Sequence, residues 1–362
     1  MQLHVGHISA LMNPLTYVII NLAIVALLYV GSIEINIGGM ASGDVIALVN
    51  YMNQILIELV KLANLIVQVS KALACAGRVQ AVLDTEPGME FPQEPAGEVP
   101  AEKAGDAVRF DHVGLTYQGA GAPSLTYAGA GAPSLSDISF TAKRGQTIGV
   151  IGGTGSGKSS LISLIPRFYD ATEGSVEIMG RPIRQYPRAD LRGRVAVVMQ
   201  KAQLFGGTIR SNLLWGNQNA SEADLWAALE TAQAAEFVRS KPLGLDEPVE
   251  QGGRNLSGGQ KQRLTIARAL VGRPDILILD DSASALDYAT DAALRKALAA
   301  LPGALTVFIV SQRAASLQHA DQIIVLDDGH MVGLGRHAEL LDSCPVYREI
   351  YESQFKKGDA QK

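Results

Sequence analysis

The sequence has few charged residues and almost no cysteine. Charged residues make up 19% of the 362 positions, whereas hydrophobic residues make up 47%. This is apolar for a soluble enzyme, so a membrane-inserted part is expected. The two cysteines, Cys75 and Cys344, lie outside any metal-binding spacing, which favours reduced thiols in a cytosolic setting. A net charge of −5 argues against nucleic acid as the main partner.

Charge is absent altogether from residues 8–33. This stretch is longer than the roughly 20 residues that cross a bilayer. A signal peptide is the alternative, but no Lys or Arg precedes the stretch and it is too long for the apolar region of such a peptide. We therefore predict a transmembrane helix over 8–33.

A second apolar segment, over about 45–75, carries polar residues mostly at three- and four-residue steps. These residues are Asn50, Asn53, Gln54, Glu58, Lys61, Asn64 and Gln68. The spacing places them on one face of a helix, and lipid would penalise that face. We predict a second span whose polar face meets other helices or an aqueous cavity. A helix on a soluble core, or one leaving the membrane partway, is the alternative.

The residues that flank the second span predict its orientation and the domain that follows. The loop before it has acids and no basic residue, whereas Lys71 and Arg78 come near its end, so the rest of the chain is expected to be cytoplasmic. Residues 1–83 thus form a partial transmembrane domain. The acidic, Pro-rich segment 84–107 reads as a linker. Alternating strand and helix patterns over 108–362 predict an α/β domain with a β-rich edge.

The most specific motif begins where the apolar run 147–151 ends. The sequence GGTGSGKS fits G-x-x-x-x-G-K-[ST] and leads into a helical pattern. Glycines let backbone N–H groups converge on phosphate oxygens, Lys158 adds positive charge there, and the Ser159 hydroxyl suits Mg²⁺. The motif predicts binding of a nucleoside triphosphate. The residues assigned to this phosphate loop are Gly152, Gly153, Thr154, Gly155, Ser156, Gly157, Lys158, Ser159 and Ser160.

Two adjacent acids, Asp280 and Asp281, follow the apolar run 276–279. A buried parallel strand delivers side chains to a reaction site at its carboxyl end. Asp280 is therefore the expected second acid of a P-loop enzyme and a ligand of Mg²⁺ beside Ser159.

The segment NLSGGQKQRLTIARAL, residues 255–270, resembles the signature of ATP-binding-cassette (ABC) ATPases. The resemblance implies an α/β P-loop NTPase with a β-rich edge and a helical subdomain, here preceded by two transmembrane helices. It also implies that Ser257, Gly258, Gly259 and Gln260 reach the nucleotide held by an opposing subunit. The cap formed by these residues suits an anion on physical grounds as well.

The same resemblance assigns further residues to the nucleotide site. Gln200 resembles the glutamine that touches Mg²⁺, and Asp287, in the sequence SALD, belongs to a loop that communicates across the dimer. A near-identical repeat, LTYQGAGAPSL followed by LTYAGAGAPSL, offers both Tyr117 and Tyr127 as the aromatic residue that stacks on adenine. Tyr117 is preferred because it continues directly from its strand.

Two positions depart from the family pattern. Asp281 stands where a Glu usually polarises the attacking water, and its carboxylate is withdrawn by about 1 Å, a shift that can cost on the order of 100-fold in rate. Gln312 stands where a His usually contacts the γ-phosphate, and Gln cannot carry a positive charge. Lys158, Gln200, Asp281 and Gln312 are the expected catalytic set. The combination resembles the degenerate-site subunit of heterodimeric ABC exporters.

The whole resemblance predicts one half of an ATP-driven exporter in the cell (inner or plasma) membrane. Its expected ligands are ATP, Mg²⁺, lipid and an unidentified solute, without nucleic acid. Its expected partner is a second ABC half-transporter, in a heterodimer rather than a slow homodimer. Exporter halves usually have more than two spans, so the chain is expected to be truncated or to rely on spans from elsewhere. A soluble ABC ATPase and a non-transporting regulatory subunit remain the alternatives.

Overall fold

The computed structural model describes residues 2–85, 88–94, 105–117, 133–282, 286–301 and 304–355. The chain divides into two compact units, Met1–Gly88 and Met89–Lys362.

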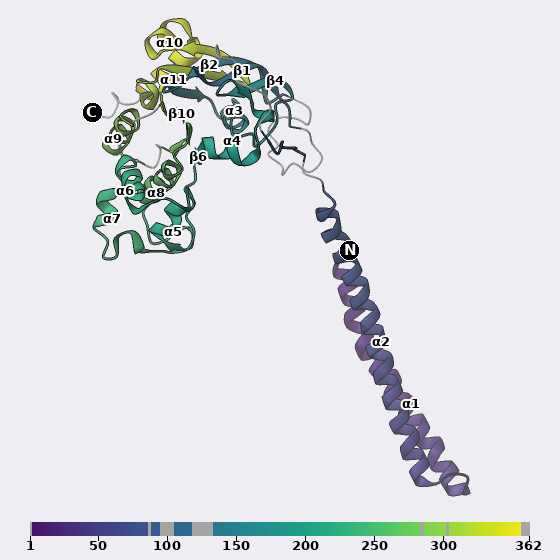
Figure 1. The fold of residues 1–362 in the computed structure, drawn as a ribbon. Helices are drawn as coiled ribbons and strands as arrows, with labels where there is room; N and C mark the ends of the chain where they lie inside the picture. The colour runs from purple at the N-terminus through teal and green to yellow at the C-terminus, as the bar shows by residue number, and fades with distance from the viewer. Residues whose placement is uncertain are drawn as a thin grey trace. The chain divides into compact units, whose positions relative to one another are not determined.

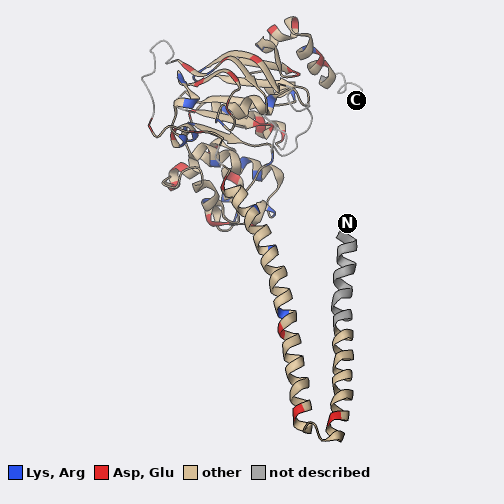
Figure 2. Ribbon diagram, turned by 90° about the vertical axis from the view of Figure 1, so that its right-hand side faces the viewer, with Lys and Arg blue, Asp and Glu red and all other residues tan. Residues whose placement is uncertain are grey.

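The first unit is a pair of long helices, α1 (Gln2–Ile37) and α2 (Ser42–Leu83), joined by a short turn (Figure 1). Gly38 has a φ of 79° in this turn, a conformation that favours glycine. Both helices extend past the predicted ranges 8–33 and 45–75, because flanking residues continue the helix without being apolar enough to mark a span. Both are long and apolar enough to cross a membrane, and charged residues are sparse along them (Figure 2).

The second unit is built around a six-stranded sheet. Five neighbouring strands run parallel, and the sixth, at one edge of the sheet, is antiparallel to them. In sheet order the strands are β12 (His330–Gly335), β11 (Gln322–Asp327), β3 (Thr147–Gly152), β10 (Thr306–Val310), β9 (Ile276–Asp280) and β6 (Val195–Val198). The strands in the middle of this sheet are almost wholly buried, as their continuous Val, Ile and Leu runs require.

A second, antiparallel sheet forms the β-rich edge that the sequence predicted. Its strands, in order, are β2 (Leu135–Lys143), β1 (Asp106–Leu115), β4 (Glu173–Ile178) and β5 (Arg181–Pro182). The first strand begins at Asp106, inside the predicted linker 84–107, because Ala107 is fully buried and pairing extends to Lys143. Phe140 stacks on Phe110 at 4.7 Å and meets Phe308 of the central sheet at 6.5 Å, so aromatic packing joins the two sheets.

Helices cover the central sheet and form a separate subdomain (Figure 1). The subdomain comprises α5 (Ile209–Leu214), α6 (Glu222–Thr231), α7 (Ala235–Arg239) and α8 (Gly258–Val271). The remaining helices are α3 (Lys158–Leu164), α4 (Arg188–Arg194), α9 (Tyr288–Ala299), α10 (His337–Ser343) and α11 (Pro345–Phe355). The α/β architecture with a helical subdomain and two preceding helices confirms the predicted fold class.

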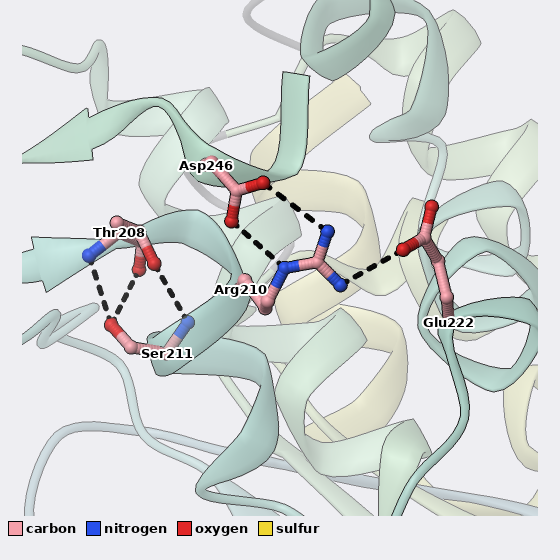
Figure 3. Close-up of polar contacts among 5 residues, drawn as sticks. All are labelled: Thr208, Arg210, Ser211, Glu222 and Asp246. Atoms are coloured by element: carbon pink, nitrogen blue, oxygen red, sulfur yellow. Dashed lines mark hydrogen bonds and ion pairs between the residues drawn. The ribbon is translucent and has the colours of Figure 1, made fainter. Parts of the chain in front are cut away.

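Polar contacts at the start of α5 link it to neighbouring parts of this subdomain (Figure 3). Arg210 donates to Asp246 at 2.8 Å and to Glu222, at the start of α6, at 3.0 Å. Thr208 and Ser211 cap α5 reciprocally, through the Ser211 N–H to Thr208 Oγ1 at 3.0 Å and the Thr208 N–H to Ser211 Oγ at 2.9 Å. These side chains are partly exposed, so they orient the helices more than they stabilise the fold.

Removing the Phe140 ring should weaken the contact between the two sheets. We expect Phe140→Ala to lower the free energy of unfolding by about 3–5 kcal/mol, since a large buried ring leaves a cavity. Val332→Ala, at an exposed position, should change it by less than about 0.5 kcal/mol. Urea denaturation followed by tryptophan fluorescence would measure both, and a loss for Phe140→Ala no larger than for the control would contradict the packing argument.

Candidate nucleotide site

The phosphate loop is a tight turn between β3 and α3 that glycine makes possible. Gly155 and Gly157 have φ values of 83° and 95°, in the left-handed region. A Cβ atom on Gly157 would lie 2.9 Å from the Ser134 carbonyl oxygen, and one on Gly152 would lie 2.2 Å from that of Leu326. The strand–loop–helix context required for a phosphate-binding loop is therefore present, with the backbone turned as an anion site needs.

Lys158 lies across this loop. Its Nζ donates to the carbonyl oxygens of Gly152 at 2.9 Å and Gly153 at 2.5 Å. Burial lowers the pKa of Lys158, and the negative charges of Asp280 and Asp281 oppose that shift. The ammonium group is thus held at the phosphate loop with two carboxylates close enough to act on it.

Strand register brings the predicted catalytic residues to one edge of the sheet. Val310, at the end of β10, pairs with Val150 of β3 on one side and with Asp280 of β9 on the other. The phosphate loop, the paired acids and Gln312 all follow these three neighbouring strands. Gln200 follows β6, which pairs with β9. This edge is the carboxyl end of the parallel strands, where ligands of open α/β sheets bind.

The two acids differ in their surroundings. Burial raises the pKa of Asp280, the charge of Asp281 raises it further, and Lys158 opposes both. Asp281 has a φ of 44°, uncommon for a residue other than glycine, and its N–H donates to the Val310 carbonyl at 2.9 Å. Its Oδ2 accepts a hydrogen bond from Gln200 Nε2 at 3.1 Å. The sequence assigned Gln200 to Mg²⁺ but did not predict this contact with Asp281.

The donor set at this edge fits a magnesium ion that is shared with phosphate. Among the residues that the structure describes, no group of three or more His, Cys, Asp or Glu side chains could hold a metal ion. Mg²⁺ in phosphoryl-transfer sites needs only one or two carboxylates beside phosphate oxygens and water. The oxygens of Ser159, Asp280 and Gln200 have the required chemistry.

Tyr117 lies beside the helix that follows the phosphate loop. Its hydroxyl donates to Ser160 Oγ at 3.0 Å, and its ring meets Tyr169 edge to face at 5.0 Å. The side chain is 37% exposed, and burial raises the pKa of its hydroxyl. Part of the ring is therefore accessible to a base. Tyr127, the other candidate, lies outside the described residues.

The signature residues lie in the helical subdomain. Ser257 caps α8, accepting the Gln260 N–H at 3.3 Å while its own N–H donates to Gln260 Oε1 at 3.0 Å. Ser257 and Gly258 are exposed, so the cap is accessible from outside. Asp287 caps α9 through Thr290, with both contacts at 2.8 Å, and the Thr290 N–H lowers the pKa of its carboxyl. Ser284 and Ala285 of the SALD loop, and Ala283 before it, lie outside the described residues.

Gln312 stands just beyond β10 with an exposed side chain. Its backbone carbonyl accepts a hydrogen bond from Gln354 Nε2 at 2.7 Å. Sequence reasoning missed Gln354, because it is far along the chain in α11 and belongs to no motif. It also missed Tyr169, whose proximity to Tyr117 depends on tertiary packing.

Comparison with known proteins gives a consistent result. Residues 135–284 match the family model described as ABC transporter. The chain is 41% identical over 355 residues to an uncharacterized ABC transporter ATP-binding protein of Mycobacterium tuberculosis, covering 97% of this chain and 59% of the relative. It is 38% identical over 337 residues to an ATP-dependent lipid A-core flippase of Xanthomonas campestris pv. campestris, covering 92% and 54% respectively.

A solved structure is similar in fold. A bacterial Atm1-family ABC exporter with ATP bound matches with a TM-score of 0.73 and 29% identity, covering 98% of this chain and 60% of the other. The chain thus spans little more than half the length of these proteins. The unit that carries the phosphate loop, the paired acids and the signature is an ABC transporter ATP-binding domain, and ATP hydrolysis is the general activity of that family. Both long helices fall within the matched exporter architecture.

The raised pKa of Asp280 predicts a conflict between stability and function. An acid whose pKa is higher in the folded state than in the unfolded state, where it is about 3.9, stabilises the fold at pH values below the unfolded pKa. This stabilisation is lost as pH rises through the folded-state pKa. Asp280→Asn should therefore be more stable than wild type at pH 7, by on the order of 1 kcal/mol or less because solvent screens a half-exposed group. The difference should vanish in acid, while Mg²⁺-dependent tightening of ATP binding is lost.

Thermal denaturation across pH and calorimetry with and without Mg²⁺ would test this pair of effects. Asp342→Asn, at an exposed acid in α10, is the matched control and should change neither quantity. A stability gain that persisted in acid would show that ionisation of Asp280 is not its cause.

Truncating Tyr117 should weaken nucleotide binding. Stacking of a base on an aromatic ring contributes about 1–3 kcal/mol, so we expect Tyr117→Ala to weaken ATP binding by roughly tenfold or more and Tyr117→Phe to preserve it. Titration with a fluorescent ATP analogue measures the affinity. Tyr127→Ala is the comparison, and a larger loss there than in Tyr117→Ala would assign the stacking role to Tyr127.

Proposed function

We propose that this chain acts as one half of an ABC exporter that couples ATP binding and hydrolysis to export of a solute. ABC exporters work as dimers of half-transporters, and the match to one of them extends over the helices and the ATP-binding domain together. The observation that carries the proposal is the convergence of Lys158, Asp280, Asp281 and Gln200 at the carboxyl edge of the sheet, in one chain with two long apolar helices.

The helices α1 and α2 insert in the cell (inner or plasma) membrane, with the ATP-binding domain in the cytoplasm. Their described apolar side chains are largely exposed, which suits contact with lipid and with other helices. On α2, Lys61 donates to Glu58 at 2.7 Å, and both side chains are more than half exposed. A charged pair within a span is expensive in lipid, so it faces neighbouring helices or a solvated pathway.

ATP binds at the phosphate loop with its base on Tyr117. Backbone N–H groups and Lys158 hold the phosphates, while Ser159, Asp280 and Gln200 hold Mg²⁺. The ion, when bound, neutralises charge that develops on the β- and γ-phosphates. Asp281 orients the attacking water, and Gln312 contacts the γ-phosphate, as the positions of these residues in the family pattern imply.

Hydrolysis at this site is slow, and the signature serves the site of the partner. Asp281 is shorter than Glu, and its carboxylate also accepts the Gln200 hydrogen bond, which draws it toward the β6 side of the edge. Gln312 supplies a neutral amide where a cation would stabilise developing charge. The exposed cap at Ser257–Gln260 is free of these changes. This asymmetry favours a heterodimer with a competent second ABC subunit over a homodimer.

Restoring both side chains should raise ATP turnover. We expect Asp281→Glu/Gln312→His, in the full chain at concentrations that favour dimers, to hydrolyse ATP about 100-fold faster than wild type, since an error of about 1 Å has a cost of that order. Phosphate release measures the rate. Lys158→Met added to the double variant is the control and should remove the gain. Rapid turnover by the wild type would instead indicate a self-sufficient homodimer.

A further inference from the structure

The side chain of Gln354 makes two hydrogen bonds with the loop that carries Gln312. Its Nε2 donates to the Gln312 carbonyl at 2.7 Å, and its Oε1 accepts the Ala314 N–H at 2.9 Å. An amide matches this pair because it presents a donor and an acceptor side by side. The reversed amide would set a donor against the Ala314 N–H, so these partners fix its orientation.

The sheet holds the rest of the loop. The Ser311 N–H donates to the Val150 carbonyl of β3 at 3.1 Å, and the Arg313 N–H donates to Ser311 Oγ at 2.9 Å. Ser311 is 2% exposed and Ala314 is fully buried, so both ends of the turn are fixed. Of the hydrogen bonds described for residues 311–314, the two made by Gln354 join the loop to a separate helix.

The helix that presents Gln354 is firmly anchored. Tyr347 of α11 is fully buried, its hydroxyl lies 2.8 Å from His337 Nδ1, and burial raises its pKa to about 12. Arg348 Nε donates to the Leu341 carbonyl at 2.6 Å. Gln354 comes two helical turns after Tyr347 and so lies on the same side of α11. The helix is a support against which the loop can be held.

We propose that Gln354 is a positioning residue for Gln312. By holding the backbone on both sides of residue 313, it fixes the direction in which the Gln312 side chain leaves the end of β10, beside the phosphate loop. The C-terminal helix thereby becomes part of the nucleotide site without touching nucleotide. This inference rests on the proposed function for the role of Gln312, but the contact itself does not.

A double-mutant cycle in the full chain tests the inference. Gln354→Met keeps the side-chain length and helix propensity but removes both polar atoms. We expect it to lower kcat for ATP by roughly fivefold, the scale of one or two hydrogen bonds, with KM unchanged within about twofold. In a Gln312→Ala background the same substitution should change kcat by less than about twofold, because its effect passes through Gln312.

Ser353→Ala is the matched control, since Ser353 bonds only within α11 in the described contacts, to the Ile350 carbonyl. It should leave kcat and KM unchanged. If Gln354→Met lowers kcat equally in the wild-type and Gln312→Ala backgrounds, the inference is overturned. It is also overturned if Gln312→Ala lowers kcat but Gln354→Met does not.

Amide hydrogen exchange separates failure of this inference from failure of the proposed function. If Gln312→Ala leaves turnover unchanged, the assigned role of Gln312 is wrong, and exchange at Ala314 then decides on the contact alone. Faster exchange there in Gln354→Met, and not in Ser353→Ala, supports positioning of the loop by α11. Unchanged exchange overturns it.

Discussion

The parallel pairing of β3, β10 and β9 is the constraint on which the site depends. Backbone hydrogen bonds in this sheet fix the relative height of the strands, so Val150, Val310 and Asp280 lie at the same level. The chain segments that leave this level carry the residues assigned to the site: the phosphate loop, the paired acids and Gln312. A slip of register would turn side chains to the opposite face and separate these groups.

The electrostatics of the site follow from that geometry. Burial makes ionised Asp280 and protonated Lys158 each less favourable than in water, and their mutual attraction offsets part of the cost. Asp281 adds a second negative charge beside the first. ATP with Mg²⁺ would change the electrostatic surroundings of Lys158 and of Asp280 together. Under the proposed function, the site therefore trades some stability for binding, as is common where charges converge.

The overall α/β order could be predicted from the sequence, because it depends on local apolar patterns. The phosphate-loop motif and Asp280 lie where the sequence placed them, after β3 and at the end of β9. Tyr117 also continued from its strand as expected. The Gln200–Asp281 bond and the Gln354 contacts could not be predicted, because they join segments that only tertiary packing brings together. Ala107 was assigned to the linker because one small apolar residue gives little pattern. In the structure it is fully buried and belongs to β1, whose residues on either side of it pair with β2.

The signature residues form a cap at the start of α8 that lies apart from the chain's own phosphate loop. Ser257 and Gln260 hydrogen-bond to each other and α8 packs in the helical subdomain, so the cap is held in place by the chain's own contacts. The start of this helix favours an anion through its dipole, but the phosphate loop of the same chain lies at the edge of the central sheet. Such a cap becomes useful when another subunit brings phosphate to it. Under the proposed function, the dimeric partner of an ABC exporter half supplies that phosphate, and the cap can then stay intact while Asp281 and Gln312 depart from the family pattern in the chain's own site.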